Sequence, residues 1–163
     1  MKINEDHLKK MVTILKENGL KISTMESCSG GALASAITSI EGASQVFSFG
    51  AVTYNNEFKL KMGVSPYVIK RYGPYHIKTT QEMAKNAAKF ANSHIGVGIS
   101  GQLCIKDTSD DKNYDDNLVY LSVYIADEKQ FYNKTIKVLT KNRVEAKNSI
   151  VNIVIDTILE IYS

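Results

Sequence analysis

The chain has 163 residues, 44% of them apolar, which is enough for one domain around a single core, over residues 1–163, and too little for two. The 20 Lys and Arg against 17 Asp and Glu give a net charge of only +3, without a basic run interleaved with aromatics, which excludes the electrostatic footprint of a nucleic-acid binder. The chain has only two cysteines, and its N-terminus lacks the apolar core of a signal peptide. No apolar run reaches the ~18 residues that a membrane span needs. We therefore expect a cytoplasmic domain with no membrane partner.

The first half of the chain predicts helices that alternate with strands. Leu8, Met11, Val12 and Leu15 recur at helical spacing, and Gly19 is placed to end that helix. The elements expected next are a strand over residues 20–25, a helix over 32–40, a strand over 45–54, and short helices over 57–62 and from Pro66 to Gly73. The stretch between residues 25 and 32 is therefore a strand–turn–helix junction.

The second half adds a helix, three strands and a last helix. Thr79 and Glu82 form a capping-box pattern that predicts the start of a helix running through Phe90. The elements expected after it are a buried strand over residues 94–100, a long polar loop over 101–117, a hairpin over 118–126 and 130–139, and a final helix capped by Asn142 and Glu145. Helices and strands in this order predict a three-layer α/β/α sandwich with a mixed sheet.

The sequence TMESCSGG at residues 24–31 lies at the predicted junction. In open α/β sheets ligands bind beyond the carboxyl ends of strands, and a glycine-rich turn lets helix N–H groups approach an anion. Ser27, Ser29, Gly30 and Gly31 occupy that position. A purely structural turn, in which Ser29 caps the next helix and the glycines relieve strain, is the alternative.

A serine hydroxyl needs a base before it can act as a nucleophile. None of His7, His76 and His94 is obviously placed for this, and a solvated or capping role is expected for each. Tyr54 at a strand end and Lys59 after the following turn could lie over the same sheet edge as Ser27. Desolvation can lower the pKa of a lysine enough for it to accept a proton, although an ordinary surface lysine is the alternative.

Several segments in chain order resemble the nicotinamide mononucleotide deamidases, which occur alone or as the C-terminal domain of the competence/damage-inducible protein CinA. The segments are MESCSGG at residues 25–31, GAVTYNNEFK at 50–59, GV at 63–64, YGPYH at 72–76, ISG at 99–101 and KNR at 141–143. The first two segments, taken together, are specific for this family. The resemblance implies a CinA C-terminal-type fold and metal-free, cofactor-free hydrolysis of the nucleotide's amide to nicotinic acid mononucleotide and ammonia.

Residue roles carried over from this resemblance centre on Ser27 as nucleophile, Lys59 as its base, and Tyr54 as a proton relay or orienting hydroxyl. Glu26 and Ser29 are expected to shape and cap the turn. The substrate-binding residues that the resemblance implies are Ser29, Gly30, Gly31, Ser100, Gly101 and Arg143, with the two glycines of the turn bringing N–H groups to an anionic or oxyanionic part of the substrate.

The chain departs from the family pattern after Gly101. Residues 102–118 replace the family's glycine-rich G-P-x-G-G and K-P-V-G segments with a loop that carries five aspartates and two lysines. Carboxylates of such a loop would repel a nucleotide phosphate by about 1 kcal/mol per close pair in water. His76 also stands where the family has a serine. Three outcomes are open: an active deamidase with a rebuilt pocket, an amidohydrolase with another substrate, or a member that binds a nucleotide-like ligand or a protein without catalysis.

A calcium-binding pattern in the polar loop is incomplete. Asp111, Asn113 and Asp115 mimic the start of a calcium-binding loop, but Asp116 stands where glycine is needed and Ser122 where a glutamate should be, so no metal is predicted.

Cys28 beside a helix start is a rival thiol nucleophile, which the resemblance makes a packing residue instead. Finally, the apolar last helix and the strand around Phe47 and Phe49 suggest more apolar surface than one small domain hides, so a homodimer or higher homo-oligomer is expected.

Overall fold

The computed structural model describes residues 1–103, 117–138, 140 and 142–163. Most of the predicted polar loop, with the calcium-like positions Asp111, Asn113 and Asp115, lies outside the described residues. The elements are α1 (Glu5–Glu17), β1 (Ile22–Glu26), α2 (Ala32–Thr38), the short 3-10 helix η1 (Ala43–Gln45), β2 (Phe47–Val52), α3 (Asn56–Lys61), α4 (Pro66–Tyr72), α5 (Ile77–Ala91), β3 (Ile95–Gly101), β4 (Leu118–Ile125), β5 (Gln130–Lys137) and α6 (Arg143–Tyr162).

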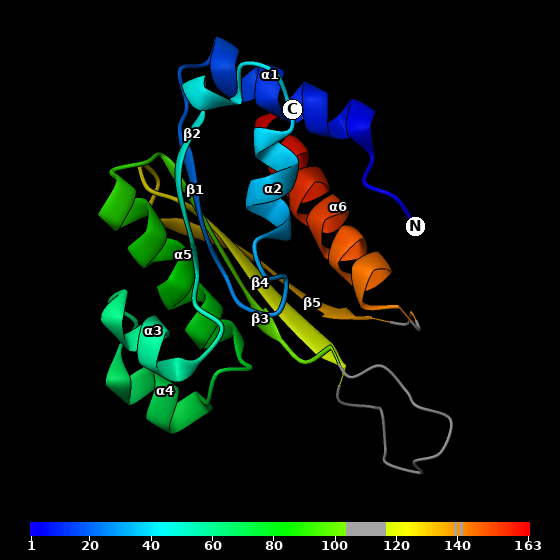
Figure 1. Cartoon of the computed structure of the whole chain (residues 1–163). Coiled ribbons are helices and arrows are strands. Elements are labelled where there is room, and N and C mark those ends of the chain that lie inside the picture. Colours follow the sequence, from blue (N-terminus) through cyan, green and yellow to red (C-terminus); the bar gives the residue numbers. More distant parts are fainter. Residues whose placement is uncertain (104–116, 139, 141) are drawn as a thin grey trace.

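The five strands form one mixed sheet in the order β2-β1-β3-β4-β5. β1 runs parallel to both β2 and β3, while β3, β4 and β5 are joined as antiparallel pairs. Helices α1, α2 and α6 cover one face of the sheet, and α3, α4 and α5 lie on the other (Figure 1). The predicted α/β/α sandwich with a mixed sheet is confirmed. Because β1, β2 and β3 are parallel, the segments that follow them meet at one sheet edge.

The larger core lies between the sheet and the helices α1, α2 and α6. The buried apolar residues of α6 belong to it: Ala146, Ile150, Val151, Val154, Ile155 and Ile158. On the strand β2, Phe47 packs against this core and Phe49 against Phe90, with ring centroids 4.6 Å apart. The apolar residues that suggested an oligomer are thus largely used inside the chain, and the oligomer stays a prediction. Among the described helices none is both long and apolar enough to cross a membrane.

The start of α5 differs from the predicted capping box. The N-cap is His76, whose Nδ1 accepts a hydrogen bond from the Lys78 N–H at 3.0 Å. Thr79 lies inside the helix, and its hydroxyl donates to the Gly73 carbonyl at 2.6 Å, so it ties the helix to the preceding turn instead of capping it. The other predicted cap is confirmed, since the Asn142 side chain accepts from the N–H groups of Val144 and Glu145.

Two glycines of β3 let the backbone of α5 approach the sheet closely. A Cβ atom at Gly96 would lie 1.9 Å from the Ala84 carbonyl oxygen, and one at Gly98 would lie 2.2 Å from that of Thr80. Both obstacles are backbone atoms, which cannot rotate away as a side chain can. The close contact of α5 with β3 therefore requires glycine at these two positions.

We expect Gly98→Ala to lower the free energy of unfolding by at least about 3 kcal/mol, the upper end of the usual cost of overpacking, because the helix backbone itself must move. Thermal or urea denaturation measures this. Gly19→Asn is the control, since Gly19 has a φ of +63° that asparagine tolerates, and a Cβ atom at this position would meet nothing within 4 Å. A Gly98→Ala protein as stable as the parent would contradict the packing argument.

Candidate functional site

The turn after β1 is held by a buried carboxylate. Glu26 is 1% exposed, and its oxygens accept hydrogen bonds from the Ser29 hydroxyl at 2.7 Å and from the N–H groups of Leu33 at 2.9 Å and Ala34 at 3.0 Å. These two N–H groups belong to the first turn of α2 and have no partner within that helix. Glu26 therefore fixes α2 to the end of β1, as the predicted shaping and capping roles of Glu26 and Ser29 require.

Ser27 lies one residue further on and meets Lys59 of α3. The Lys59 side chain is 1% exposed, and its Nζ lies 3.1 Å from the Ser27 Oγ and 2.7 Å from the Thr53 carbonyl oxygen. Thr53 follows β2 and is anchored beside β1, because its N–H donates to the Glu26 carbonyl at 2.8 Å. Two adjacent strand ends thus hold both partners of the lysine.

The short helix α3 turns Lys59 back over the sheet edge. The Asn55 side chain caps this helix by accepting from the Phe58 N–H at 3.1 Å, so α3 begins directly after the end of β2. Lys59 lies one turn into the helix and is its buried residue, while Phe58 and Leu60 on either side are exposed. The sequence prediction that Ser27 and Lys59 converge is thereby matched in the geometry.

Burial lowers the pKa of the Lys59 ammonium below its ordinary value of 10.5, against a smaller opposing effect from Cys28. Desolvation disfavours the charged form, and the contacts of Nζ are to neutral oxygens, not to a carboxylate. A larger fraction of Lys59 is therefore neutral near pH 7 than of an exposed lysine. A neutral amine 3.1 Å from a serine hydroxyl can accept its proton.

Cys28 does not have the properties of a nucleophilic thiolate. Burial, and to a smaller extent the charge of Glu26, raises the pKa of Cys28 to about 12, so the group is a protonated thiol at neutral pH. Its side chain is 5% exposed. Reactive cysteines have the opposite properties, a low pKa and access to solvent. The packing role is therefore favoured over the rival thiol nucleophile.

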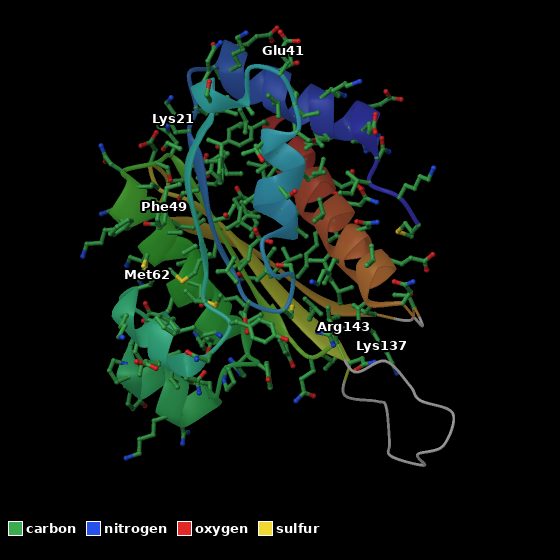
Figure 2. All side chains as sticks on the ribbon, viewed as in Figure 1. Lys21, Glu41, Phe49, Met62, Lys137 and Arg143 are labelled. Carbon is green, nitrogen blue, oxygen red and sulfur yellow. The ribbon has the colours of Figure 1, made fainter. Side chains whose placement is uncertain are left out.

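A pocket opens over Ser27 at this edge of the sheet. The described residues that line it are Ser27, Cys28, Tyr54, Tyr75, Gly101, Gln102, Leu103 and Arg143. Arg143 reaches it from the first turn of α6, where its guanidinium donates to the Leu103 carbonyl. Figure 2 shows Arg143 at the end of α6 that lies beside the turn between β1 and α2.

Tyr54 lines this pocket but does not join the Ser27–Lys59 pair. Its side chain is 64% exposed, and within the described part of the chain its hydroxyl makes no hydrogen bond. The phenol is thus available to a ligand in the pocket. Its predicted role as a relay stays a prediction.

The structure does not bring every predicted substrate-binding residue to the pocket. The Ser29 hydroxyl is fully buried against Glu26, because that carboxylate needs the donor. Ser100 is also fully buried, and its hydroxyl donates to the Pro74 carbonyl at 2.7 Å. That bond fixes the turn from which Tyr75 reaches the pocket, so Ser100 acts on the site through this turn. Gly101 and Arg143 do line the pocket.

Gly30 and Gly31 adopt left-handed backbone conformations, with φ of +60° and +93°. They lie beside the pocket and are not among its lining residues. The Gly30 N–H donates to the Ser27 carbonyl at 3.0 Å and is therefore not free for an oxyanion. The expected contribution of both glycines is thus to the shape of the turn, through conformations that other residues rarely adopt.

Sequence reasoning missed three parts of the site. The Thr53 contact to Lys59 is made by a backbone carbonyl, which no side-chain pattern announces. Gln102 and Leu103 begin the divergent loop, and no sequence motif identifies them as pocket residues. Tyr75 belongs to the segment YGPYH and received no role, although the Gly-Pro dipeptide before it marks a turn and so places Tyr75 in a loop.

The fold and this site define an α/β/α domain with a buried serine–lysine pair at the carboxyl ends of parallel strands. The family model described as "CinA C-terminal domain" matches residues 4–162, and the chain belongs to this family. A CinA-like protein of Kosmotoga olearia is 38% identical over 125 residues, which cover 76% of this chain and 30% of that protein. The chain thus matches less than a third of this relative's length.

Solved structures show the same fold. The competence/damage inducible protein CihA from Agrobacterium tumefaciens superposes with a TM-score of 0.87 at 26% identity, covering 98% of this chain and 95% of that one. The competence or damage-inducible protein from Enterobacter asburiae superposes with a TM-score of 0.86 at 23% identity, covering 100% of both chains. The predicted CinA C-terminal-type fold is confirmed.

Replacing Lys59 should give a stability difference that depends on pH. Between the lowered pKa of Lys59 and 10.5, the unfolded chain binds a proton that the folded chain does not, so the parent gains stability as pH rises through that window. A methionine at position 59 binds no proton in either state, so the variant lacks this gain. We expect the melting temperature of Lys59→Met, relative to the parent, to fall between pH 7 and pH 10, with a slope of up to about 1.4 kcal/mol per pH unit in the free energy of unfolding.

The matched control is Lys61→Met, which removes a positive charge from the same helix, but from an exposed side chain paired with Glu57 at 3.0 Å. Thermal denaturation of the three proteins in the same buffers corrects for the other titrating groups. A difference between Lys59→Met and the parent that stays constant over this range would contradict a lowered pKa of Lys59.

The buried thiol of Cys28 should resist alkylation. In a Cys104→Ala background, we expect iodoacetamide at pH 8 to leave Cys28 unmodified in the folded protein and to modify it fully in urea, because the thiolate is scarce and covered in the native state. Mass spectrometry of the intact protein measures this. Modification of the folded protein at the rate of a free thiol would restore Cys28 as a candidate nucleophile.

Proposed function

We propose that the chain is an amidohydrolase of the nicotinamide-nucleotide deamidase type, which converts nicotinamide mononucleotide and water to nicotinic acid mononucleotide and ammonia. The observation that carries this proposal is the buried contact of 3.1 Å between the Lys59 Nζ and the Ser27 Oγ, in a lysine whose pKa is lowered by desolvation. The specific motif pair at residues 25–31 and 50–59, which holds both residues, supports the same activity.

The proposed reaction begins with neutral Lys59. It takes the proton of the Ser27 hydroxyl while Oγ attacks the carbon of the carboxamide, and a tetrahedral intermediate forms. The Lys59 ammonium then returns the proton to the amide nitrogen, the C–N bond breaks, and ammonia leaves an acyl ester on Ser27. Water attacks this ester with Lys59 again as base, which releases the carboxylic acid and restores the serine.

The remaining pocket residues fit the substrate's other groups. Tyr54 and Tyr75 supply aromatic faces on the pocket wall, which suit a planar pyridinium ring, since a cation is attracted to the face of an aromatic ring. The Tyr54 hydroxyl can donate to the carbonyl oxygen of the amide as negative charge develops there. Tyr54 would in this way orient the substrate at the Ser27–Lys59 pair instead of relaying a proton within it.

Nicotinamide mononucleotide should release ammonia when incubated with the protein, and we expect Ser27→Ala and Lys59→Met each to lower the rate at least about 1,000-fold, because neither partner alone generates the alkoxide. A coupled glutamate dehydrogenase assay measures the ammonia. Ser44→Ala and Lys61→Met change an exposed serine and an exposed lysine and serve as matched controls.

Turnover that survives Ser27→Ala would contradict the proposed nucleophile. A parent protein that shows no turnover, but whose melting temperature nicotinamide mononucleotide raises, would instead favour a family member that binds a nucleotide-like ligand without catalysis. Melting curves of all variants without ligand establish that they are folded.

A further inference from the structure

The turn between α4 and α5 carries Tyr75 to the candidate pocket. Tyr75 is 44% exposed, and within the described part of the chain its side chain makes no hydrogen bond and no ring–ring contact. Its position is therefore set by the backbone on either side of it. On one side, the Gly73 carbonyl accepts from the Thr79 hydroxyl at 2.6 Å. The Pro74 carbonyl accepts from the Ser100 hydroxyl at 2.7 Å, so the backbone that leads into Tyr75 is fixed.

On the other side of Tyr75, the ring of His76 lies between two tyrosine rings. Its centroid is 4.5 Å from that of Tyr72 at an interplanar angle of 27°, and 6.4 Å from that of Tyr120 at 22°. Both distances lie in the range in which aromatic rings attract each other. Tyr72 is the last residue of α4, and Tyr120 belongs to β4. The His76 ring thus connects the end of α4 and the start of α5 to the sheet.

The cap that His76 provides and the contacts of its ring are separable. As the N-cap of α5, the Nδ1 atom accepts from the Lys78 N–H at 3.0 Å. A serine hydroxyl can make the same kind of bond, and serine is among the residues that N-cap positions prefer. A serine has no ring, however, and cannot bridge Tyr72 and Tyr120. The ring contacts are therefore what a histidine adds at the position where the family pattern has a serine.

We propose that His76 is a positioning residue of the candidate pocket, whose ring fixes the place from which Tyr75 meets a ligand. His76 is not among the residues that line the pocket, so it acts through Tyr75. A wall residue that is already ordered loses less conformational entropy when a ligand binds, which strengthens binding. The effect on substrate rests on the proposed function, whereas the effect on the position of Tyr75 does not depend on any activity.

The chain contains no tryptophan, so Tyr75→Trp places a single fluorophore at the pocket. In this background we expect His76→Ser to raise the acrylamide quenching constant about 2-fold and to lower the fluorescence anisotropy, because residue 75 loses its restraint and moves more freely on the nanosecond timescale. His76→Phe keeps a ring and loses the acceptor. It should leave quenching near the value of the Tyr75→Trp protein while lowering the melting temperature, since α5 loses its cap.

The matched control places the fluorophore elsewhere on the same turn-and-helix unit. Tyr67 lies on α4 and is 68% exposed. In a Tyr67→Trp background, His76→Ser should leave quenching and anisotropy unchanged. A change there would show that α4 loosens as a whole and would count against a specific effect on Tyr75.

Two results of the fluorescence experiment would overturn the proposal. Quenching that His76→Ser leaves unchanged in the Tyr75→Trp background would show that the ring restrains nothing. An equal increase in His76→Ser and His76→Phe would assign the restraint to the imidazole's hydrogen bond instead of its ring. Melting curves of all variants establish that they are folded.

In the ammonia assay, His76→Ser should raise the KM for nicotinamide mononucleotide about 5-fold, the factor that an average aromatic contact contributes, with kcat nearly unchanged. The Ser27–Lys59 pair is held by other elements, so the chemical step is expected to persist. His76→Phe should restore most of the parent's KM. An active protein whose KM does not change in His76→Ser would overturn the effect on substrate binding.

The two proposals fail in distinguishable ways. A parent protein that releases no ammonia loses the proposed activity, while the fluorescence experiment still decides whether His76 positions Tyr75. Conversely, an active parent in which His76→Ser changes neither quenching nor KM keeps the activity and loses the positioning residue.

Discussion

The site depends on one constraint: the amine of Lys59 is buried against Ser27, and no described carboxylate pairs with it. Removing an ammonium from water is unfavourable, so the surrounding structure must hold the side chain there. It does so through the Thr53 carbonyl, which accepts from Nζ at 2.7 Å, and through the Asn55 cap that starts α3 directly after β2. Desolvation lowers the pKa of Lys59, so the same burial that holds the amine against Ser27 also leaves a larger fraction of it neutral.

The carboxylate of Glu26 is directed away from this lysine. Glu26 is the last residue of β1 and its side chain meets α2, whereas Ser27, the first residue of the turn, meets Lys59 of α3. The Glu26 oxygens are occupied by Ser29, Leu33 and Ala34. A carboxylate next to Lys59 would instead favour its ammonium and remove the base. Of these two adjacent residues, Glu26 stabilises the turn and Ser27 faces the pocket.

The sequence predicted those parts of the molecule that local patterns encode. Helical spacing gave α1, the residues Asn142 and Glu145 gave the start of α6, and the motifs around Ser27 and Lys59 gave their convergence. Properties that arise only from packing were missed or misread. Thr79 looks like a cap but bonds to the preceding turn, Ser29 and Ser100 carry hydroxyls that the interior uses, and the Thr53 carbonyl leaves no trace in a side-chain pattern.

The divergent segment after Gly101 looked, from the sequence, like the loss of the substrate-holding part of the site. That conclusion assumed that a phosphate must be held by a glycine-rich backbone from that segment. Arg143, which lines the pocket, lies on α6, whose inner face is packed into the core. The Ser27–Lys59 pair itself is held by the ends of β1 and β2 and by α3, all of which precede the divergent segment in the chain. A different sequence after Gly101 therefore leaves this pair in place, and its effect falls on the part of the pocket lined by Gln102 and Leu103.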